Sequence, residues 1–169
     1  MIINFENKTP QVPDSVFIAE GAKIIGDVHM GKDCSVWFNT IIRGDVHYIR
    51  IGERTNIQDL SMVHVTTDTH ATIIGDDVTV GHKVMLHGCK IGDRCLIGMS
   101  ATIMDDVEIG NNVLVAAGSL VAPGTKCPDG VLLKGSPAKV ARDLKPEEIA
   151  WFLKSSERYQ NLAKRYLNQ

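Results

Sequence analysis

Three histidines stand close together in the sequence and are the residues best suited to chemistry. His64 and His87 are 23 residues apart, and His82 lies between them. Neutral imidazole nitrogens bind zinc, and three of them, with a water in the fourth position, make a catalytic zinc site. The next question is which elements of the fold would bring these rings together.

A six-residue repeat of aliphatic residues runs through most of the chain. Its positions, with three breaks in phase, are Ile18, Ile24, Met30, Val36 and Ile42; Ile51, Ile57 and Val63; Ile74, Val80 and Leu86; and Ile91, Ile97, Ile103, Ile109, Val115 and Val121. A period of six fits a short strand followed by a tight turn. Three hexads close a triangular coil of about 18 residues, and coils stack as parallel strands roughly 4.8 Å apart. The repeat therefore predicts a mainly β fold, a parallel β-helix.

Counting hexads places three polar residues in one column. Arg43, His64 and His87 each come directly after an aliphatic position of the repeat. Those aliphatic positions are three hexads apart, so the three polar residues share one face of successive coils. The step from His64 to His87 exceeds one coil by five residues, which predicts a loop around residues 66–72. Histidines stacked about 4.8 Å apart can bind one metal ion.

The third histidine, His82, falls on the preceding face and is expected to point away from the His64 and His87 column. One chain alone is therefore not expected to assemble three ligands. A homotrimer closed by heterologous contacts would bring His82 of one subunit to His64 and His87 of the next. Asp59 lies one coil below His82 on the same face, which predicts that it pairs with Arg43 of the neighbouring subunit.

The end of the chain has the pattern of a helix. Pro146 suits a first helical turn, and Glu147 and Glu148 favour its positive dipole end. Apolar residues then recur near helical spacing. We expect residues 1–140 to form the β-helix domain. Residues 141–169 are expected to form a C-terminal α-helical tail that packs on the β-helix or on a neighbouring subunit.

The hexads resemble the left-handed β-helix of the hexapeptide-repeat superfamily, and the polar residues resemble those of the γ-class carbonic anhydrases. The motifs that carry this resemblance are Arg43-Gly44-Asp45, Asn56-Ile57-Gln58-Asp59, Val63-His64-Val65 and Gly81-His82-Lys83-Val84-Met85-Leu86-His87-Gly88. The resemblance covers about residues 10–140, and the left-handed sense of the coils follows from it alone. It implies that the three histidines bind zinc, with iron or cobalt as substitutes, across subunit boundaries.

The same resemblance implies an activity, the reversible hydration of carbon dioxide to bicarbonate by a metal-bound hydroxide. It assigns Gln58 to orienting that hydroxide and places Asn56 near the substrate. Arg43, Asp45 and Asp59 match residues at the subunit interface. The metal ion would lower the pKa of its bound water toward 7.

One position departs from the family pattern. An active member of the family has an acidic residue directly after the Arg-x-Asp motif, and this chain has Val46 there. The loop over residues 66–72 is also short. His70, His47 or Tyr159 would then relay protons, and we expect low turnover. Two other readings remain open. One is an acyltransferase or a thioester hydrolase, and the other is a catalytically silent metal-binding trimer.

Composition and the N-terminal sequence limit the partners and the compartment that we expect for the protein. The formal charge is −2, so no basic excess favours a nucleic-acid partner. The N-terminus has no signal-peptide pattern and no apolar stretch long enough to span a bilayer, so we expect a cytoplasmic protein without membrane contact. The four cysteines lack CxxC spacing and are expected to be buried free thiols. Aromatic residues make up only 5%, which suits a narrow aliphatic core.

Overall fold

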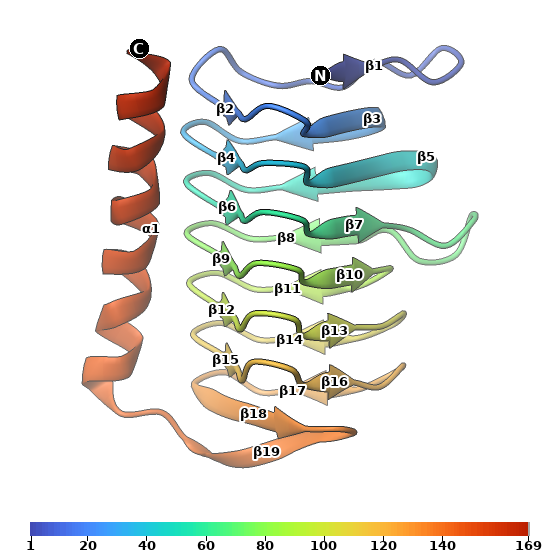
Figure 1. The fold of residues 1–169 in the computed structure, drawn as a ribbon. Coiled ribbons are helices and arrows are strands. Elements are labelled where there is room, and N and C mark those ends of the chain that lie inside the picture. The colour runs from blue at the N-terminus through green and yellow to red at the C-terminus, as the bar shows by residue number, and fades with distance from the viewer. Residues whose placement is uncertain (169) are drawn as a thin grey trace.

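A computed structural model describes residues 1–168 and shows a stack of coils with one helix along its side (Figure 1). Each coil adds short parallel strands to three faces, and equivalent residues of successive coils pair in register. Ile97 pairs with Val115, and Ile103 pairs with Val121, which is one 18-residue coil in each case. Val63 pairs with Leu86, so the predicted five-residue insertion is present between them. The predicted parallel β-helix is confirmed.

The strands follow the three faces of the coil. The first face contains the first parts of β3 (Lys23–Met30) and β5 (Ile41–Ile51), then β7 (Met62–His64), β10 (Met85–His87), β13 (Thr102–Ile103) and β16 (Leu120–Val121). The second face contains the remaining parts of β3 and β5, then β8 (Thr72–Ile74), β11 (Lys90–Ile91), β14 (Glu108–Ile109) and β17 (Lys126–Cys127). Because β3 and β5 continue around a corner, these two faces form one 11-stranded sheet, which β1 (Ile2–Ile3) joins through β3.

The third face is a separate 8-stranded sheet. Its strands are β2 (Phe17–Ile18), β4 (Ser35–Val36), β6 (Asn56–Ile57), β9 (Thr79–Val80), β12 (Leu96–Ile97), β15 (Leu114–Val115), β18 (Val131–Gly135) and β19 (Ala138–Asp143). The last two strands pair antiparallel and end the stack. Since β19 runs across residue 140, the division of the chain into residues 1–140 and 141–169 stays a prediction.

Aliphatic side chains fill the narrow interior of the coils. Ile24, Ile42, Val63 and Leu86 form one inward column, and none of them is exposed to solvent. Burial of each such side chain contributes about 1.5–3 kcal/mol. At the corners the coils approach so closely that a Cβ added to Gly98 would lie 2.4 Å from a backbone nitrogen of the next coil. These contacts fix the height of each coil, and with it the spacing of outward side chains.

Helix α1 (Pro146–Leu167) lies along the third face and contacts β2, β4, β6 and β9. It begins at Pro146, as predicted, and the carboxylate of Glu148 accepts the backbone N–H of Lys145 at 2.9 Å. Trp37 points outward from the coil, and its ring lies 5.3 Å from that of Tyr159 in the helix. The few aromatic residues therefore join the helix to the solenoid. No helix within residues 1–168 is both long enough and apolar enough to cross a membrane.

Candidate metal centre

His64 and His87 lie side by side on the first face, at the ends of β7 and β10. Strand pairing sets them opposite each other, and Nδ1 of His64 is 3.1 Å from Nε2 of His87. Two ligands at about 2.05 Å from a tetrahedral metal are themselves about 3.3 Å apart. Arg43 follows Ile42 in the strand below, so it completes the column beneath the two histidines.

The other ring nitrogen of each histidine in this pair donates its N–H to a carboxylate. Nε2 of His64 lies 3.1 Å from Oδ1 of Asp45, and Nδ1 of His87 lies 2.8 Å from Oδ1 of Asp105. A carboxylate only accepts, so these nitrogens carry the protons. The two nitrogens that face each other therefore present lone pairs when the rings are neutral. This arrangement suits a shared cation, and the carboxylates fix the rings as partners of metal-bound histidines do.

The burial of His64 favours its neutral, metal-binding form. Burial is the main cause that lowers the pKa of His64, and it outweighs the hydrogen bond to Asp45. Burial raises the pKa of Asp45, but the hydrogen bonds from Arg43 and His64 outweigh it and lower that pKa overall. Asp45 therefore remains a charged acceptor for both side chains.

His82 lies away from this pair, in the corner after β9. Its Nδ1 is 2.8 Å from Oδ2 of Asp59, which leaves Nε2 free, and 42% of its side chain is exposed. Across residues 1–168, no three histidine, cysteine or carboxylate side chains of one chain converge on a metal position. Arg43 pairs with Asp45 of its own chain, so its pairing with Asp59 of a neighbouring subunit stays a prediction.

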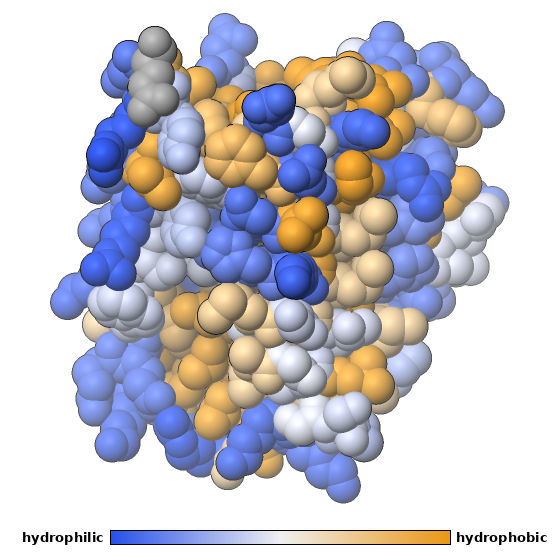
Figure 2. Space-filling view, viewed as in Figure 1, coloured by the Kyte–Doolittle hydropathy of each residue, from blue (hydrophilic) through white to orange (hydrophobic). Residues whose placement is uncertain are grey.

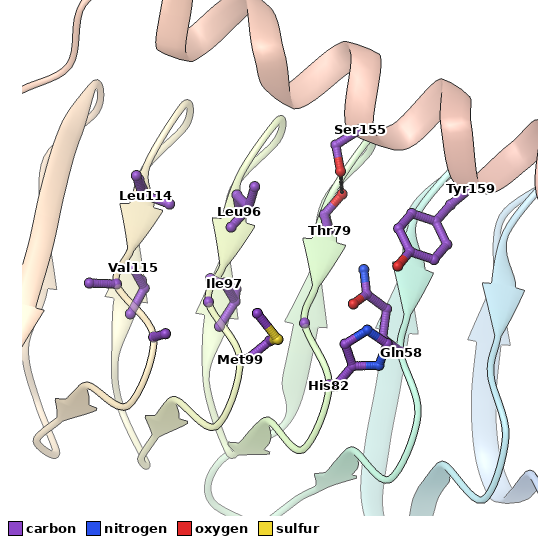
Figure 3. Close-up of a pocket in the computed structure, with 14 residues that line it drawn as sticks. Gln58, Thr79, His82, Leu96, Ile97, Met99, Leu114, Val115, Ser155 and Tyr159 are labelled. Atoms are coloured by element: carbon purple, nitrogen blue, oxygen red, sulfur yellow. Dashed lines mark hydrogen bonds between the residues drawn. The ribbon is translucent and has the colours of Figure 1, made fainter.

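Gln58 and Asn56 belong to a buried hydrogen-bond chain that reaches the helix. Nε2 of Gln58 donates to Oδ1 of Asn56 at 3.0 Å, and Nδ2 of Asn56 donates to Oγ1 of Thr79 at 3.0 Å. The Thr79 hydroxyl then bonds to that of Ser155 in α1, also at 3.0 Å (Figure 3). Helix α1 therefore holds the orientation of the Gln58 amide through three successive bonds.

A cavity of about 500 Å³ lies between α1 and the third face. Gln58 and His82 lie at one end of it, with Tyr159 reaching toward them from α1 (Figure 3). Leu96 and Leu114 line the other end. The surface over the groove beside α1 is correspondingly hydrophobic along the lower coils (Figure 2). Gln58 and His82 thus border a largely apolar space, whereas His64 and His87 do not line it.

Comparison with known proteins identifies the family. The profile of the family described as "Bacterial transferase hexapeptide (six repeats)" matches residues 71–103 and 88–123. A carbonic anhydrase of Geobacillus kaustophilus is 45% identical over 149 residues, covering 88% of this chain and 81% of that protein. The chain belongs to the γ-carbonic anhydrase family. Gamma carbonic anhydrase 1 of Arabidopsis thaliana mitochondria is 44% identical over 167 residues, 96% of this chain, and the chain spans 61% of its length.

Two further proteins are similar to this chain over nearly its whole length. Protein YrdA of Escherichia coli is 45% identical over 166 residues, 95% of this chain and 90% of that protein. A hexapeptide transferase family protein from Anaplasma phagocytophilum has a similar crystal structure, with a TM-score of 0.93 and 41% identity, covering 98% of this chain and 97% of that one. The left-handed β-helix that the resemblance implied is thereby confirmed.

Two residues beside the candidate site were not expected from the sequence, Asp105 and Thr66. The Thr66 hydroxyl donates to Oδ1 of Asp105 at 2.8 Å, beside His87. Neither residue has a signal in the repeat, because Thr66 lies in the inserted loop and Asp105 in a corner, where the period of six does not set the direction of a side chain. Cys89, close to His87 in sequence, is buried, and burial raises its thiol pKa to about 12, so it does not offer a thiolate.

The three residues considered for proton transfer lie in two places. His47 and His70 line a separate cavity of about 220 Å³ on the side of the inserted loop, and Nδ1 of His70 is buried there without a hydrogen-bond partner. Tyr159 borders the larger cavity, and burial, aided by the charge of Asp59, raises its pKa. Their part in the reaction stays a prediction.

Proposed function

We propose that this protein is a metal-dependent carbonic anhydrase that hydrates carbon dioxide to bicarbonate. In this proposal it works as a homotrimer whose metal centre takes His64 and His87 from one subunit and His82 from the next. Zinc is the proposed metal, with iron or cobalt as substitutes that three imidazoles also accept. The cytoplasmic location expected from the sequence stays a prediction.

The observation that supports the metal site is the donor set itself. Nδ1 of His64 and Nε2 of His87 face each other at 3.1 Å, and each of the three histidines hydrogen-bonds through its other ring nitrogen to its own carboxylate. His82 keeps a free nitrogen in an exposed corner, and among residues 1–168 no group of three metal-binding side chains forms around it. A closed ring of subunits would bring His82 of one subunit to His64 and His87 of the next and so complete the set of three ligands.

The remaining site residues would act around that centre. When bound, zinc lowers the pKa of a coordinated water toward 7. Gln58 borders the cavity beside His82, and its amide is held by Asn56, so it can orient a small polar group there. Asp45 and Arg43 hold His64 in place. Val46 packs against the core and carries no titratable group, so we expect slow proton release and low turnover.

The test is metal analysis combined with stopped-flow hydration of carbon dioxide by zinc-, cobalt- and iron-loaded protein. We expect one metal per chain, a trimeric mass, and hydration that is lost on His64→Ala. His29→Ala is the matched control, since His29 is a partly exposed histidine outside the site. Stoichiometric metal without hydration under any loading would overturn the proposal and leave a silent metal-binding trimer.

The cavity favours one second candidate function. Its volume of about 500 Å³ and its leucine lining exceed what carbon dioxide requires and suit an apolar acyl chain. The same metal centre would then hydrolyse a thioester or an ester. Activity toward acyl-CoA or nitrophenyl esters that depends on chain length, and is lost on Leu96→Trp while hydration remains, would support this candidate. The absence of any such hydrolysis by a protein active on carbon dioxide would exclude it.

A further inference from the structure

Asp105 differs from the corner carboxylates Asp76, Asp93 and Asp129, because it accepts no backbone N–H from the preceding coil and bonds to two side chains instead. Asp76, Asp93 and Asp129 each accept a backbone N–H from the preceding coil, at 2.7, 2.9 and 2.8 Å. Oδ1 of Asp105 instead accepts from Nδ1 of His87 and from the hydroxyl of Thr66, both at 2.8 Å. The three side chains form a closed group, since Oγ1 of Thr66 is also 3.5 Å from Nδ1 of His87.

The backbone around this group leaves room for the carboxylate. Asp105 belongs to the coil after that of His87, so its side chain must reach back across the corner occupied by Gly88. A Cβ at Gly88 would lie 2.1 Å from Oδ1 of Asp105, and Gly88 has a φ of +58°. Any other residue would therefore displace the carboxylate as well as strain the backbone. Glycine at this corner opens the path between Asp105 and His87.

The inserted loop supplies the third member. Thr66 begins this loop and is fixed by backbone bonds to His70, with its N–H donating to the His70 carbonyl at 3.0 Å. At the other end of the loop, the hydroxyl of Thr72 donates to the carbonyl of His64 at 2.6 Å. The insertion is thus tied to both stacked histidines, to one through Thr72 and to the other through Thr66.

We infer that Asp105 is a positioning residue for His87, and that Thr66 in turn positions Asp105. This inference rests on the proposed metal site. Because Asp105 accepts the proton of Nδ1, His87 keeps the tautomer whose free Nε2 points at Nδ1 of His64. Without the carboxylate, the ring is free to exchange tautomers and to turn its lone pair away. Partners of this kind change metal affinity by about 10–100-fold.

The test compares Asp105→Ala and Thr66→Val with Asp93→Asn, a corner carboxylate that bonds only to backbone. Zinc affinity of the full chain is measured by competition with a chromophoric chelator. The His87 tautomer of the metal-free protein is read from nitrogen-15 NMR of labelled histidine. We expect Asp105→Ala to weaken zinc binding by about 10–100-fold and to populate both tautomers. Asp105→Glu should recover part of the affinity, Thr66→Val should have a smaller effect than Asp105→Ala, and Asp93→Asn should leave both readouts unchanged.

The outcomes separate this inference from the proposed function. If Asp105→Ala, folded by circular dichroism, keeps the wild-type zinc affinity and a single His87 tautomer, the inference is wrong and the metal site stands. If the wild-type protein binds none of zinc, cobalt and iron, the proposed function fails. The tautomer measurement needs no metal, so in that case it still tests Asp105. If Asp105→Ala loses the single His87 tautomer of the wild-type protein, Asp105 controls the ring. If the single tautomer persists in that variant, the inference is wrong.

Discussion

The sharing of one metal centre between two subunits can be tested by mixing two defective variants. His82→Ala keeps the His64 and His87 pair but cannot supply the third ligand, whereas the double variant His64→Ala/His87→Ala keeps only His82. In a closed ring of three, each centre joins the pair of one subunit to His82 of the next. A mixed trimer then contains a single junction where both halves are intact, so neither variant alone forms a centre but a mixture does.

The size of the recovery follows from the geometry of the ring. With equal amounts and random assembly, three quarters of the trimers are mixed, and each has one intact centre of three. Mixing therefore restores about a quarter of the wild-type centres, and homotrimers of either variant restore none. The assay co-refolds the two variants and measures bound zinc per chain together with carbon dioxide hydration, while native mass spectrometry counts mixed trimers. Mixed trimers that bind no metal would refute a centre built across subunits.

Three further predictions concern stability and reactivity. Thr79→Val removes the hydroxyl that joins Asn56 to α1 and should destabilise the fold by about 1–3 kcal/mol. Each kcal/mol lowers the Tm of a domain of this size by about 2–4 °C, so an unchanged melting curve would contradict the prediction. The four cysteines are buried, and burial raises the pKa of three of them to about 12, so Ellman's reagent at pH 8 should label none in the native protein and all four in guanidinium. The hydrogen bond from Arg142 lowers the pKa of Glu148 from 4.5 to about 2, so its stabilising effect on α1 is present above pH 4.5 and lost as the pH falls toward 2. Glu148→Gln should remove that pH dependence from far-UV circular dichroism, and an identical acid transition in both proteins would count against it.

The fold could be predicted almost entirely from the sequence because its repeat is short and its pairing rule is simple. In a parallel β-helix the partner of a residue is one coil away, so counting from Ile42 to Val63 to Leu86 gives the true register. What counting could not give is the face that α1 covers. That choice depends on the outward aromatic side chains Phe17 and Trp37, whose packing against the helix is a tertiary contact.

The site was predictable only where side-chain direction follows the strand. His64 and His87 follow inward aliphatic residues within strands, so their shared column follows from alternation. Asp105 lies in a corner, where backbone angles and a neighbouring glycine decide the direction of the side chain. His82 also lies in a corner, yet its separation from the pair could be inferred because the hexad count assigns it to another face. The six-residue repeat does not determine the direction in which a side chain points from a turn.

The carboxylate partners bear on how metal binding and assembly are related. Asp45, Asp59 and Asp105 hold the three histidine rings within a single chain, before any second subunit is present. Assembly of the proposed trimer would therefore join two prepared half-sites, with little cost in ordering side chains. If the metal binds the trimer and not the monomer, linkage requires that the metal strengthens the trimer by the same factor by which assembly strengthens metal binding. Removing the metal with a chelator should then raise the protein concentration at which the trimer dissociates, and variants that free a ring should weaken both equilibria together.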